Sequence, residues 1–391
     1  MNFELCENQQ TFRDKVLHFA RGLTEDVIER DKASQFSRDA WKQCAEFGLQ
    51  GMAIPKEYGG CESTDFMTGV LGMEAMGEAC RDLGLAFALN AQIWTVQHPI
   101  LRFGTEDQKQ RILPGMCSGN LIGAHALTEP NTGSDVFSLE TVAQRCEGGY
   151  RLNGAKRLVT LGPIADLMLV FATVDPSLGR WGVTAFIVER DSPGLTVGPV
   201  QEKMGLRTVP LGELTFTDCF VPESNRLGAE GNGFSISQHS LEFERCSILA
   251  SQIGAMQHQL DVAIEFARSR QQFGQAVGKF QSVSNRIAEM RLRIETSRLL
   301  LYKVAWLKQH EKPAMLEAAM LKLHLSEAYV ESSLDAIRIH GGRGYLTDVG
   351  SSEISAMRSA VCSMRALQIF NATLLLACWG SDRGISSAPD D

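Results

Sequence analysis

The two ends of the chain differ from its middle in how apolar and polar residues follow one another. In residues 1–120, apolar residues recur at the spacing of amphipathic helices, as in Trp41–Leu49 and Thr68–Cys80. Glycine-containing breaks at Tyr58–Gly60 and at Gly104 separate these stretches. The pattern predicts a helical N-terminal domain, residues 1–120.

Over residues 121–230 the pattern changes to short apolar runs between turn residues. The turn residues include Asp191-Ser192-Pro193-Gly194, which is typical of a loop between strands. The strand-like runs are Leu158–Thr160, Leu167–Ala172, Thr184–Val188 and Glu213–Phe216. This part of the chain is predicted to form a central β domain, residues 121–230.

Helical patterns return in residues 231–380 and are much longer there. Ser247–Arg270, Gln281–Gln309 and Pro313–His340 are rich in Ala, Leu, Glu, Arg and Met. Three or four such helices in series predict an antiparallel bundle. Residues 381–391 are polar and are predicted to be a frayed tail. The fold class is therefore α+β, mainly α, and the interfaces between domains are the expected place for a cofactor pocket.

Composition and charge exclude several classes of protein. The 391 residues carry a net charge of −8, which argues against a nucleic-acid-binding protein. No apolar run approaches the ~20 residues of a membrane helix, and the N-terminus lacks the pattern of a signal peptide. The 10 cysteines form no C-x-x-C pair. We expect reduced thiols in a cytoplasmic protein, with neither a disulfide framework nor a metal site.

The strongest local signal is the segment Ala126-Leu127-Thr128-Glu129-Pro130-Asn131-Thr132-Gly133-Ser134-Asp135. Its hydroxyls and glycine turn could present several N–H groups to a phosphate or to an electron-poor ring. On composition alone, a polar turn between two domains explains the segment at least as well.

Further motifs follow in a fixed order along the chain: Gly154-Ala155-Lys156, Val159-Thr160 with Gly162, Lys203-Met204-Gly205, Val221-Pro222 with Leu227-Gly228, Arg270-Gln271-Gln272-Phe273-Gly274, Phe280-Gln281 and Gly341-Gly342-Arg343-Gly344-Tyr345. Together with residues 126–135, this series resembles the acyl-CoA dehydrogenase flavoprotein family. The resemblance covers nearly the whole chain. It implies an N-terminal helical domain, a central β domain and a C-terminal four-helix bundle, with one FAD per subunit in a homotetramer or homodimer.

The resemblance also implies roles for residues of the β domain. Leu127 and Thr128 are similar to the pair that lines the edge of the flavin ring. Thr160 is similar to the hydroxyl that donates to flavin N5, although without the family it would be taken for an ordinary strand threonine. Ser134 is similar to a neighbour of the pyrophosphate or of the substrate thioester.

A second set of implied cofactor residues lies in the bundle. Arg270, Gln272 and Phe273 resemble residues that reach the ADP half of FAD on a neighbouring subunit, where the planar guanidinium of arginine suits phosphate oxygens. The alternative is a solvated helix end. Gly341 and Gly342 resemble a close backbone approach to the pyrophosphate, and the alternative is a helix C-cap.

The catalytic base is where the chain departs most from the family. Most members carry it in a late Glu-Gly-Thr motif, but Leu367-Gln368-Ile369 stands there, and no glutamate follows Ile354. A minority of members, such as isovaleryl-CoA and prolyl-carrier-protein dehydrogenases, carry the glutamate earlier, directly before an arginine. Glu244-Arg245 matches that position. The resemblance therefore implies Glu244 as the base that removes the α-proton and Arg245 as a substrate-binding residue. The alternative is a surface ion pair.

Other residues differ from the family around the flavin and the substrate. Leu158 stands where a tryptophan shields the flavin, and Arg338 replaces a glutamine before Gly341-Gly342, where an arginine could still meet a pyrophosphate. Thr208-Val209-Pro210 replaces a Ser-x-Thr motif. Glu242 is two residues from Glu244 and is expected to point elsewhere, because residues i and i+2 of a helix lie on different faces.

The resemblance implies FAD-dependent α,β-dehydrogenation of an acyl or aminoacyl thioester. In this reaction the base removes the α-proton while flavin N5 takes the β-hydride. The thioester is expected on a carrier protein in a biosynthetic pathway, and the main alternative is a short- or branched-chain acyl-CoA. Two further alternatives are an oxygen-using flavin oxidase or monooxygenase and a flavin-free homologue that acts as a binding partner. The sequence does not identify the electron acceptor.

Overall fold

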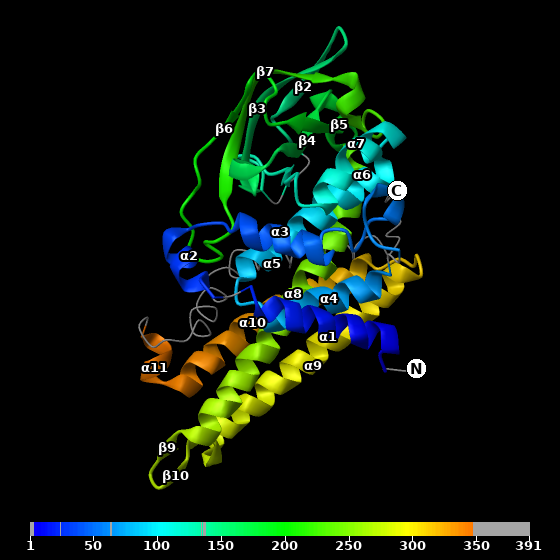
Figure 1. Cartoon of the computed structure of the whole chain (residues 1–391). Coiled ribbons are helices and arrows are strands. Elements are labelled where there is room, and N and C mark those ends of the chain that lie inside the picture. Colours follow the sequence, from blue (N-terminus) through cyan, green and yellow to red (C-terminus); the bar gives the residue numbers. More distant parts are fainter. Residues whose placement is uncertain (1–3, 24, 63–64, 134, 136–137, 347–391) are drawn as a thin grey trace, which may run out of the picture.

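The computed structural model describes residues 4–23, 25–62, 65–133, 135 and 138–346. Helices form the first part of the chain, strands the middle and long helices the last described part (Figure 1). The order of elements confirms the predicted mainly helical α+β class. Residues 347–391, which include Leu367–Asn371 and the predicted tail, lie outside the described residues.

The N-terminal helices pack around apolar side chains from several of their number. Local sequence fixes their ends: the hydroxyl of Ser37 accepts a hydrogen bond from the N–H of Ala40, and Gly48 ends the same helix at φ 97°. The α-helices of this part are α1 (Glu7–Arg21), α2 (Val27–Ala33), α3 (Arg38–Phe47), α4 (Phe66–Ala79), α5 (Leu83–Gln92), α6 (His98–Phe103) and α7 (Glu106–Cys117). A π-helical turn, Ile93–Gln97, joins α5 to α6.

A largely antiparallel sheet follows, with the order β6-β7-β3-β2-β4-β5-β8, and β1 pairs parallel with β4. All seven residues of β4 are buried, which fits its apolar sequence Leu-Met-Leu-Val-Phe-Ala-Thr and its central place. The strands are β1 (Gly123–Ala126), β2 (Val142–Cys146), β3 (Gly149–Thr160), β4 (Leu167–Thr173), β5 (Val183–Glu189), β6 (Leu195–Val197), β7 (Leu211–Pro222) and β8 (Arg226–Leu227).

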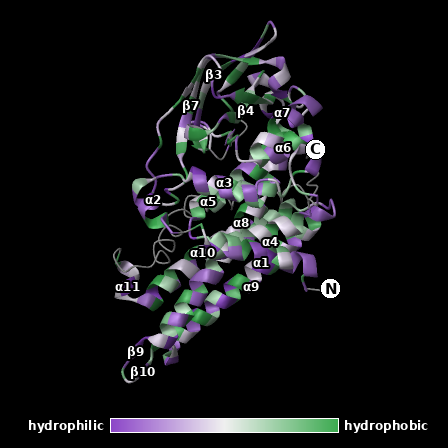
Figure 2. Ribbon diagram, in the orientation of Figure 1, coloured by the Kyte–Doolittle hydropathy of each residue, from purple (hydrophilic) through white to green (hydrophobic). Residues whose placement is uncertain are grey.

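Three long helices form the described part of the bundle: α8 (Gly233–Ser269), α9 (Gln281–Gln309) and α10 (Met315–His340), followed by the short α11 (Gly342–Tyr345). A small hairpin of β9 (Gln271–Gln272) and β10 (Gln275–Ala276) joins α8 to α9 at the end of the bundle away from the sheet (Figure 1). Polar residues colour much of α1 and α9 on the outside of the molecule (Figure 2). The predicted fourth long helix falls in residues outside the described part.

Helix α8 connects the two ends of the molecule, because its 37 residues span about 55 Å. It crosses α4 at very close range. A Cβ on Gly77 would lie 1.8 Å from the carbonyl oxygen of Ser251, and a Cβ on Gly254 would lie 1.9 Å from that of Glu74. Glycine at these two positions therefore lets the backbones meet and fixes α8 against the N-terminal domain.

Candidate active site

The segment that follows β1 is tied to β3 by backbone groups. The carbonyl oxygen of Leu127 accepts a hydrogen bond of 3.1 Å from the Lys156 ammonium, and that of Thr128 accepts one of 2.8 Å from the N–H of Arg157. Leu127 is buried and Thr128 is half-buried. These contacts fix the backbone that carries both predicted flavin-edge residues.

A buried ion pair supports this segment from inside. The Lys156 ammonium lies 2.6 Å from the Glu129 carboxylate, and the two side chains are 0% and 1% exposed. The carboxylate also accepts the N–H groups of Glu140 and Thr141. Burial lowers the pKa of Lys156, against the attraction of Glu129. Burial would raise the pKa of Glu129, but Lys156 and the hydrogen bonds hold it below its usual value.

The roles of Lys156 and Glu129 were not predicted from the sequence, although both residues belong to family motifs. The available signal was a lysine at a position of strand β3 whose side chain faces the core. Such a lysine requires a buried acidic partner.

Thr160 is the last residue of β3 and is half-buried, with Leu211 of β7 as its partner in the sheet. Two residues earlier, Leu158 has a left-handed backbone, φ 56°, and is 55% exposed. The pairing of β3 with β7 shifts between Lys156 and Val159, so the strand bulges there. The residue in place of the family tryptophan therefore projects at the surface of the sheet.

Residues 129–132 form a turn in which the backbone N–H groups of Glu129 and Thr132 each donate to the carbonyl oxygen of the other residue. The hydroxyl of Thr132 is buried and has no hydrogen-bond partner among the described residues, and a Cβ on Gly133 would meet no atom within 4 Å. A buried hydroxyl of this kind fits a ligand with polar atoms. Ser134 lies outside the described residues.

Two glutamates of α8 have different surroundings. Glu242 forms an ion pair with Lys308 of α9. Glu244 is half-buried, makes no hydrogen bond or ion pair with a described residue, and its charge acts on Lys322 of α10. Burial lowers the pKa of Lys322, Glu244 opposes this effect and Arg245 adds to it. Glu242 is thus held by another helix, whereas the Glu244 carboxylate is available to a ligand.

Serine side chains share the face of α8 that carries Glu244. Relative to Glu244, Ser237 is seven residues earlier, Ser240 is four residues earlier and Ser247 is three residues later. These spacings place the three serines on one side of the helix with Glu244. All three are buried, and their hydroxyls have no hydrogen-bond partner among the described residues. Unpaired buried hydroxyls beside a carboxylate are expected where a polar ligand binds.

Aromatic and imidazole rings pack on the neighbouring face. The rings of Phe243 and Trp94 stack with centroids 5.7 Å apart, and the imidazole of His98 lies 4.2 Å from Phe243. His98 Nδ1 and His239 Nε2 are 3.0 Å apart. Burial lowers the pKa of His98 to about 3 and that of His239 to about 4, so the pair shares one hydrogen bond in the neutral form.

This cluster was not predicted from the sequence. The available signal is weak, because Trp94 lies in the π-helical turn, a conformation that is rare, often functional and without a sequence rule of its own.

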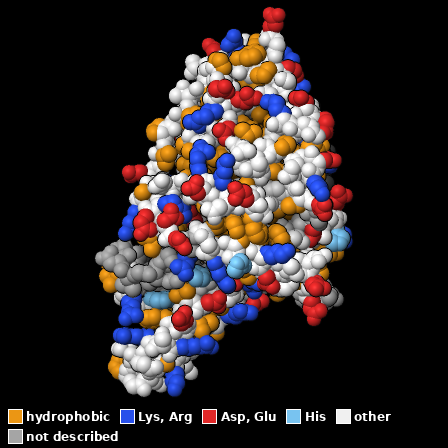
Figure 3. Space-filling model, viewed as in Figure 1, with side chains coloured by type: hydrophobic (Ala, Val, Ile, Leu, Met, Phe, Trp, Pro, Cys, Tyr) orange, Lys and Arg blue, Asp and Glu red, His pale blue; other side chains and the backbone are white. Residues whose placement is uncertain are grey.

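The bundle holds the second set of predicted cofactor residues. Arg270 is the C-cap of α8, and Gln272 and Phe273 belong to the hairpin; all three are exposed. Phe273 is 94% exposed and has φ 50°. Basic side chains gather toward this end of the molecule (Figure 3). The hairpin of β9 and β10 lies at the opposite end of the molecule from the sheet, which includes β3 (Figure 1).

Arg338, Gly341 and Gly342 lie at the same end of the bundle. The ring of His340 is 4.6 Å from that of Phe266, one turn before the end of α8. Arg338 is exposed and pairs with Asp335 at 3.1 Å. Gly341 caps α10 at φ 58°, and a Cβ on either glycine would meet no atom within 4 Å. The C-cap alternative is thus correct for Gly341, and the exposed backbone remains open to an anion.

Protein-family models match all three parts of the chain. The acyl-CoA dehydrogenase N-terminal, middle and C-terminal domains match residues 6–120, 124–219 and 231–371. The chain belongs to the acyl-CoA dehydrogenase family. It is therefore an FAD-dependent oxidoreductase of thioesters.

Three individual proteins are similar to this acyl-CoA dehydrogenase family member over most of its length. An L-prolyl-[peptidyl-carrier protein] dehydrogenase of Pseudomonas fluorescens is 44% identical over 316 residues, 81% of this chain and 83% of the relative. The structure of the prolyl acyl carrier protein oxidase AnaB has a TM-score of 0.93 and 45% identity, covering 96% of this chain and all of AnaB. PigA with FAD and proline has a TM-score of 0.92 and 35% identity, covering 98% of this chain and all of PigA.

The residues present fit FAD in two separate groups. The loop after β1 offers the buried hydroxyl of Thr132 beside Leu127 and Thr128, and the end of the bundle offers open glycine backbone and exposed arginines. No group of three or more His, Cys, Asp or Glu side chains in the described ranges could hold a metal ion. Within the same ranges, no helix has the length and apolar character that crossing a membrane requires.

Proposed function

We propose that this enzyme oxidises an aminoacyl group, prolyl in the first instance, that is carried as a thioester on a peptidyl carrier protein. The names of two similar proteins support this substrate: the dehydrogenase of Pseudomonas fluorescens and the oxidase AnaB both act on prolyl carrier proteins. PigA, which is similar over its whole length, was solved with proline as well as FAD. An acyl-CoA is the second candidate substrate class.

In this proposal Glu244 removes the α-proton of the thioester. Bound FAD supplies the acceptor for the hydride that leaves the β-carbon. Leu127, Thr128 and Thr160 hold the flavin ring, and Ser134 binds near the pyrophosphate or the thioester. Arg245, which is buried directly after the base, positions the substrate. Hydrogen bonds to the thioester carbonyl stabilise the negative charge that develops as the proton leaves.

A second part of the proposal concerns assembly. Arg270, Gln272, Phe273, Arg338, Gly341 and Gly342 complete the FAD site of a neighbouring subunit in a homotetramer or homodimer. Their exposure at the end of the bundle supports this arrangement, because one chain does not bring them to the flavin-edge residues. An arginine and open glycine backbone are suited to a pyrophosphate.

The observation that carries the function is the contrast between Glu244 and Glu242. Glu244→Gln should still bind FAD. Its flavin should be reduced by a prolyl-loaded carrier protein, under anaerobic conditions, at a rate about 10²-fold or more below that of the unaltered enzyme. Glu242→Gln is the matched control, two residues away in the same helix. The rate of flavin reduction in this variant should be within about twofold of that of the unaltered enzyme. Normal flavin reduction by Glu244→Gln would exclude this residue as the base.

A further inference from the structure

An exposed apolar patch lies where the sheet meets the start of α8. The segment between β4 and β5, Pro176–Gly182, carries Leu178 and Trp181, which are 54% and 56% exposed. Gly179 turns the chain at φ 54°, ψ −129°, between these two side chains. Contiguous exposed apolar side chains are typical of surfaces where another molecule binds.

The patch has a defined geometry. The guanidinium of Arg180 lies 4.9 Å from the ring centroid of Trp181 and 5.0 Å from that of Phe234 in α8, and the two rings are 5.6 Å apart. A Cβ on Gly231 would lie 2.7 Å from the carbonyl oxygen of Trp181, so the segment is packed directly on the backbone that leads into α8. Arg180 forms no ion pair with a carboxylate in the described ranges. Its charge is therefore available to an acidic partner.

The spacing along α8 relates the patch to the proposed base. Phe234 precedes Glu244 by ten residues, a distance of about 15 Å along the helix. The phosphopantetheine arm of a carrier protein has about 13 bonds between phosphorus and sulfur. At the rise of an extended chain, ~3.4 Å for every three bonds, it also spans about 15 Å. The arm of a thioester at Glu244 is thus long enough for its phosphate end to reach the patch.

Polar groups lie on α8 between the patch and the proposed base. The unpartnered hydroxyls of Ser237 and Ser240 are buried between Phe234 and Glu244, and both share the face of the base. The arm carries two amides between its phosphate and its sulfur. Two buried hydroxyls without partners are the groups such amides would satisfy.

We propose that Leu178, Arg180, Trp181 and Phe234 form the docking surface for the folded carrier protein. This inference rests on the proposed function and names the surface that its partner uses. Trp and Arg are the residues most enriched in the energetic centres of protein interfaces, and here they stack on each other. The partner meets this surface with apolar side chains and carboxylates around the serine that bears its arm, since Arg180 attracts acidic groups.

Trp181→Ala tests the docking surface with two substrates that share one arm. Anaerobic flavin reduction by prolyl-loaded carrier protein is compared with reduction by prolyl-CoA, which has the arm but no protein. The half-saturating concentration of the carrier protein should rise by about tenfold or more relative to that of prolyl-CoA. Arg180→Glu should also weaken the salt dependence of the carrier reaction.

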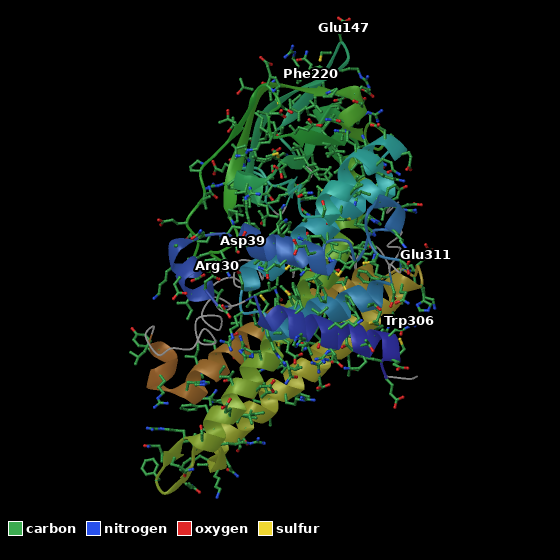
Figure 4. The ribbon with its side chains drawn as sticks, in the orientation of Figure 1. Arg30, Asp39, Glu147, Phe220, Trp306 and Glu311 are labelled. Atoms are coloured by element: carbon green, nitrogen blue, oxygen red, sulfur yellow. The ribbon has the colours of Figure 1, made fainter. Side chains whose placement is uncertain are left out.

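Another exposed cation–aromatic pair provides a matched control. Trp306 of α9 is 45% exposed, and the ammonium of Lys312 lies 4.5 Å from its ring centroid. This pair lies in the bundle, away from the sheet (Figure 4). Trp306→Ala and Lys312→Glu should change reduction by either substrate by less than about twofold.

Each other outcome has a distinct meaning. If Trp181→Ala slows both substrates equally, or slows neither, the docking surface is overturned while the proposed function stands. If the unaltered enzyme is reduced by prolyl-CoA but not by the carrier protein, both the carrier substrate and the docking surface are overturned. If neither substrate bleaches the flavin of the unaltered enzyme, the proposed function itself fails.

Discussion

The loop after β1 and the hairpin end of the bundle both carry predicted cofactor residues, but they are supported in opposite ways. The loop is held from inside by the Lys156–Glu129 ion pair and by hydrogen bonds to β3. At the hairpin, Phe273 is 94% exposed, and nothing lies within 4 Å of a Cβ on Gly274. The described part of the first region is held by contacts within its own chain, whereas the second region presents its side chains outward.

This contrast distinguishes two ways of building a cofactor site. Residues that their own domain must hold in place require buried support, and the loss of that support should reduce the free energy of unfolding. Residues that act on a neighbouring subunit require only a surface, so their loss should affect binding while leaving the free chain unchanged. The free energy of unfolding of the flavin-free protein is therefore the quantity that separates the two regions.

The largest effect is expected for Lys156→Met, which leaves the Glu129 carboxylate buried without its cation. Loss of one partner of a buried ion pair costs about 3–5 kcal/mol. Urea denaturation of the flavin-free protein measures this loss. Arg157→Met is the matched control: the Arg157–Glu213 pair spans 3.0 Å but is half exposed, so about 0–1 kcal/mol is expected.

The double variant Lys156→Met, Glu129→Gln sharpens the result. Because it removes both charges, it should recover part of the stability lost in the single variant. If Lys156→Met costs no more than Arg157→Met, the ion pair does not support the loop and the contrast between the two regions is lost.

An intermediate effect is expected from pH, through the pair of His98 in α6 and His239 in α8. Burial, and then the neighbouring charges, lower the pKa of His98 to about 3 and of His239 to about 4, whereas an unfolded histidine titrates near 6.5. The unfolded chain therefore binds these protons first, and stability is lost as the pH falls below about 6.5. The slope is at most about 1.4 kcal/mol per pH unit for each histidine.

The slope between pH 6.5 and pH 5.5 can be assigned by substitution. His98→Leu with His239→Leu should flatten the pH dependence of the free energy of unfolding, whatever its effect on stability at pH 7.5. Lys308 and Arg102 lower the pKa of both histidines, and Glu242 raises that of His239. The variant keeps these three charged residues, so that only the two imidazoles are removed. An unchanged slope would assign the pH dependence to other groups.

The sequence predicted the fold well where the local pattern and the final environment agree. The apolar run in β4 predicts a buried strand, and Leu167–Thr173 is one. Ala- and Leu-rich stretches predict long helices, and α8, α9 and α10 contain them. The helical stretch quoted from the sequence starts only at Ser247, whereas α8 begins at Gly233, because the first two turns of α8 pack on the sheet and carry Ser and Gln in place of a clear apolar stripe.

The candidate site was predicted through family motifs, and its supporting residues were not. Glu244 and Arg245 could be placed by a dipeptide that matches the family. The partner of Lys156 is 27 positions away in the chain, and that of His239 is 141 positions away. Such pairs exist only through the tertiary fold, so no local pattern in one sequence reveals them. The exposed patch at Trp181 also depends on how the β4–β5 segment packs on α8.

The smallest effect on stability is expected at the hairpin end of the bundle. A variant there is the sharpest test of the contrast between the hairpin end and the loop after β1. Arg270→Ala removes an exposed side chain, so the free energy of unfolding of the flavin-free protein should change by less than about 0.5 kcal/mol. The affinity for FAD should nevertheless fall by about tenfold or more, because a hydrogen bond to a charged group contributes about 1.5–3 kcal/mol. Fluorescence titration of the flavin-free protein with FAD measures the affinity.

Arg268→Ala is the matched control for this last prediction, since Arg268 is an exposed arginine in the last turn of the same helix. It should alter neither stability nor FAD affinity by more than the error of measurement. Equal losses of affinity in the two variants would indicate a general effect of charge and not a contact with the cofactor. A loss of stability in Arg270→Ala without FAD would show that the hairpin end supports its own chain. The two regions would then share one role, and the second region would not serve a neighbouring subunit.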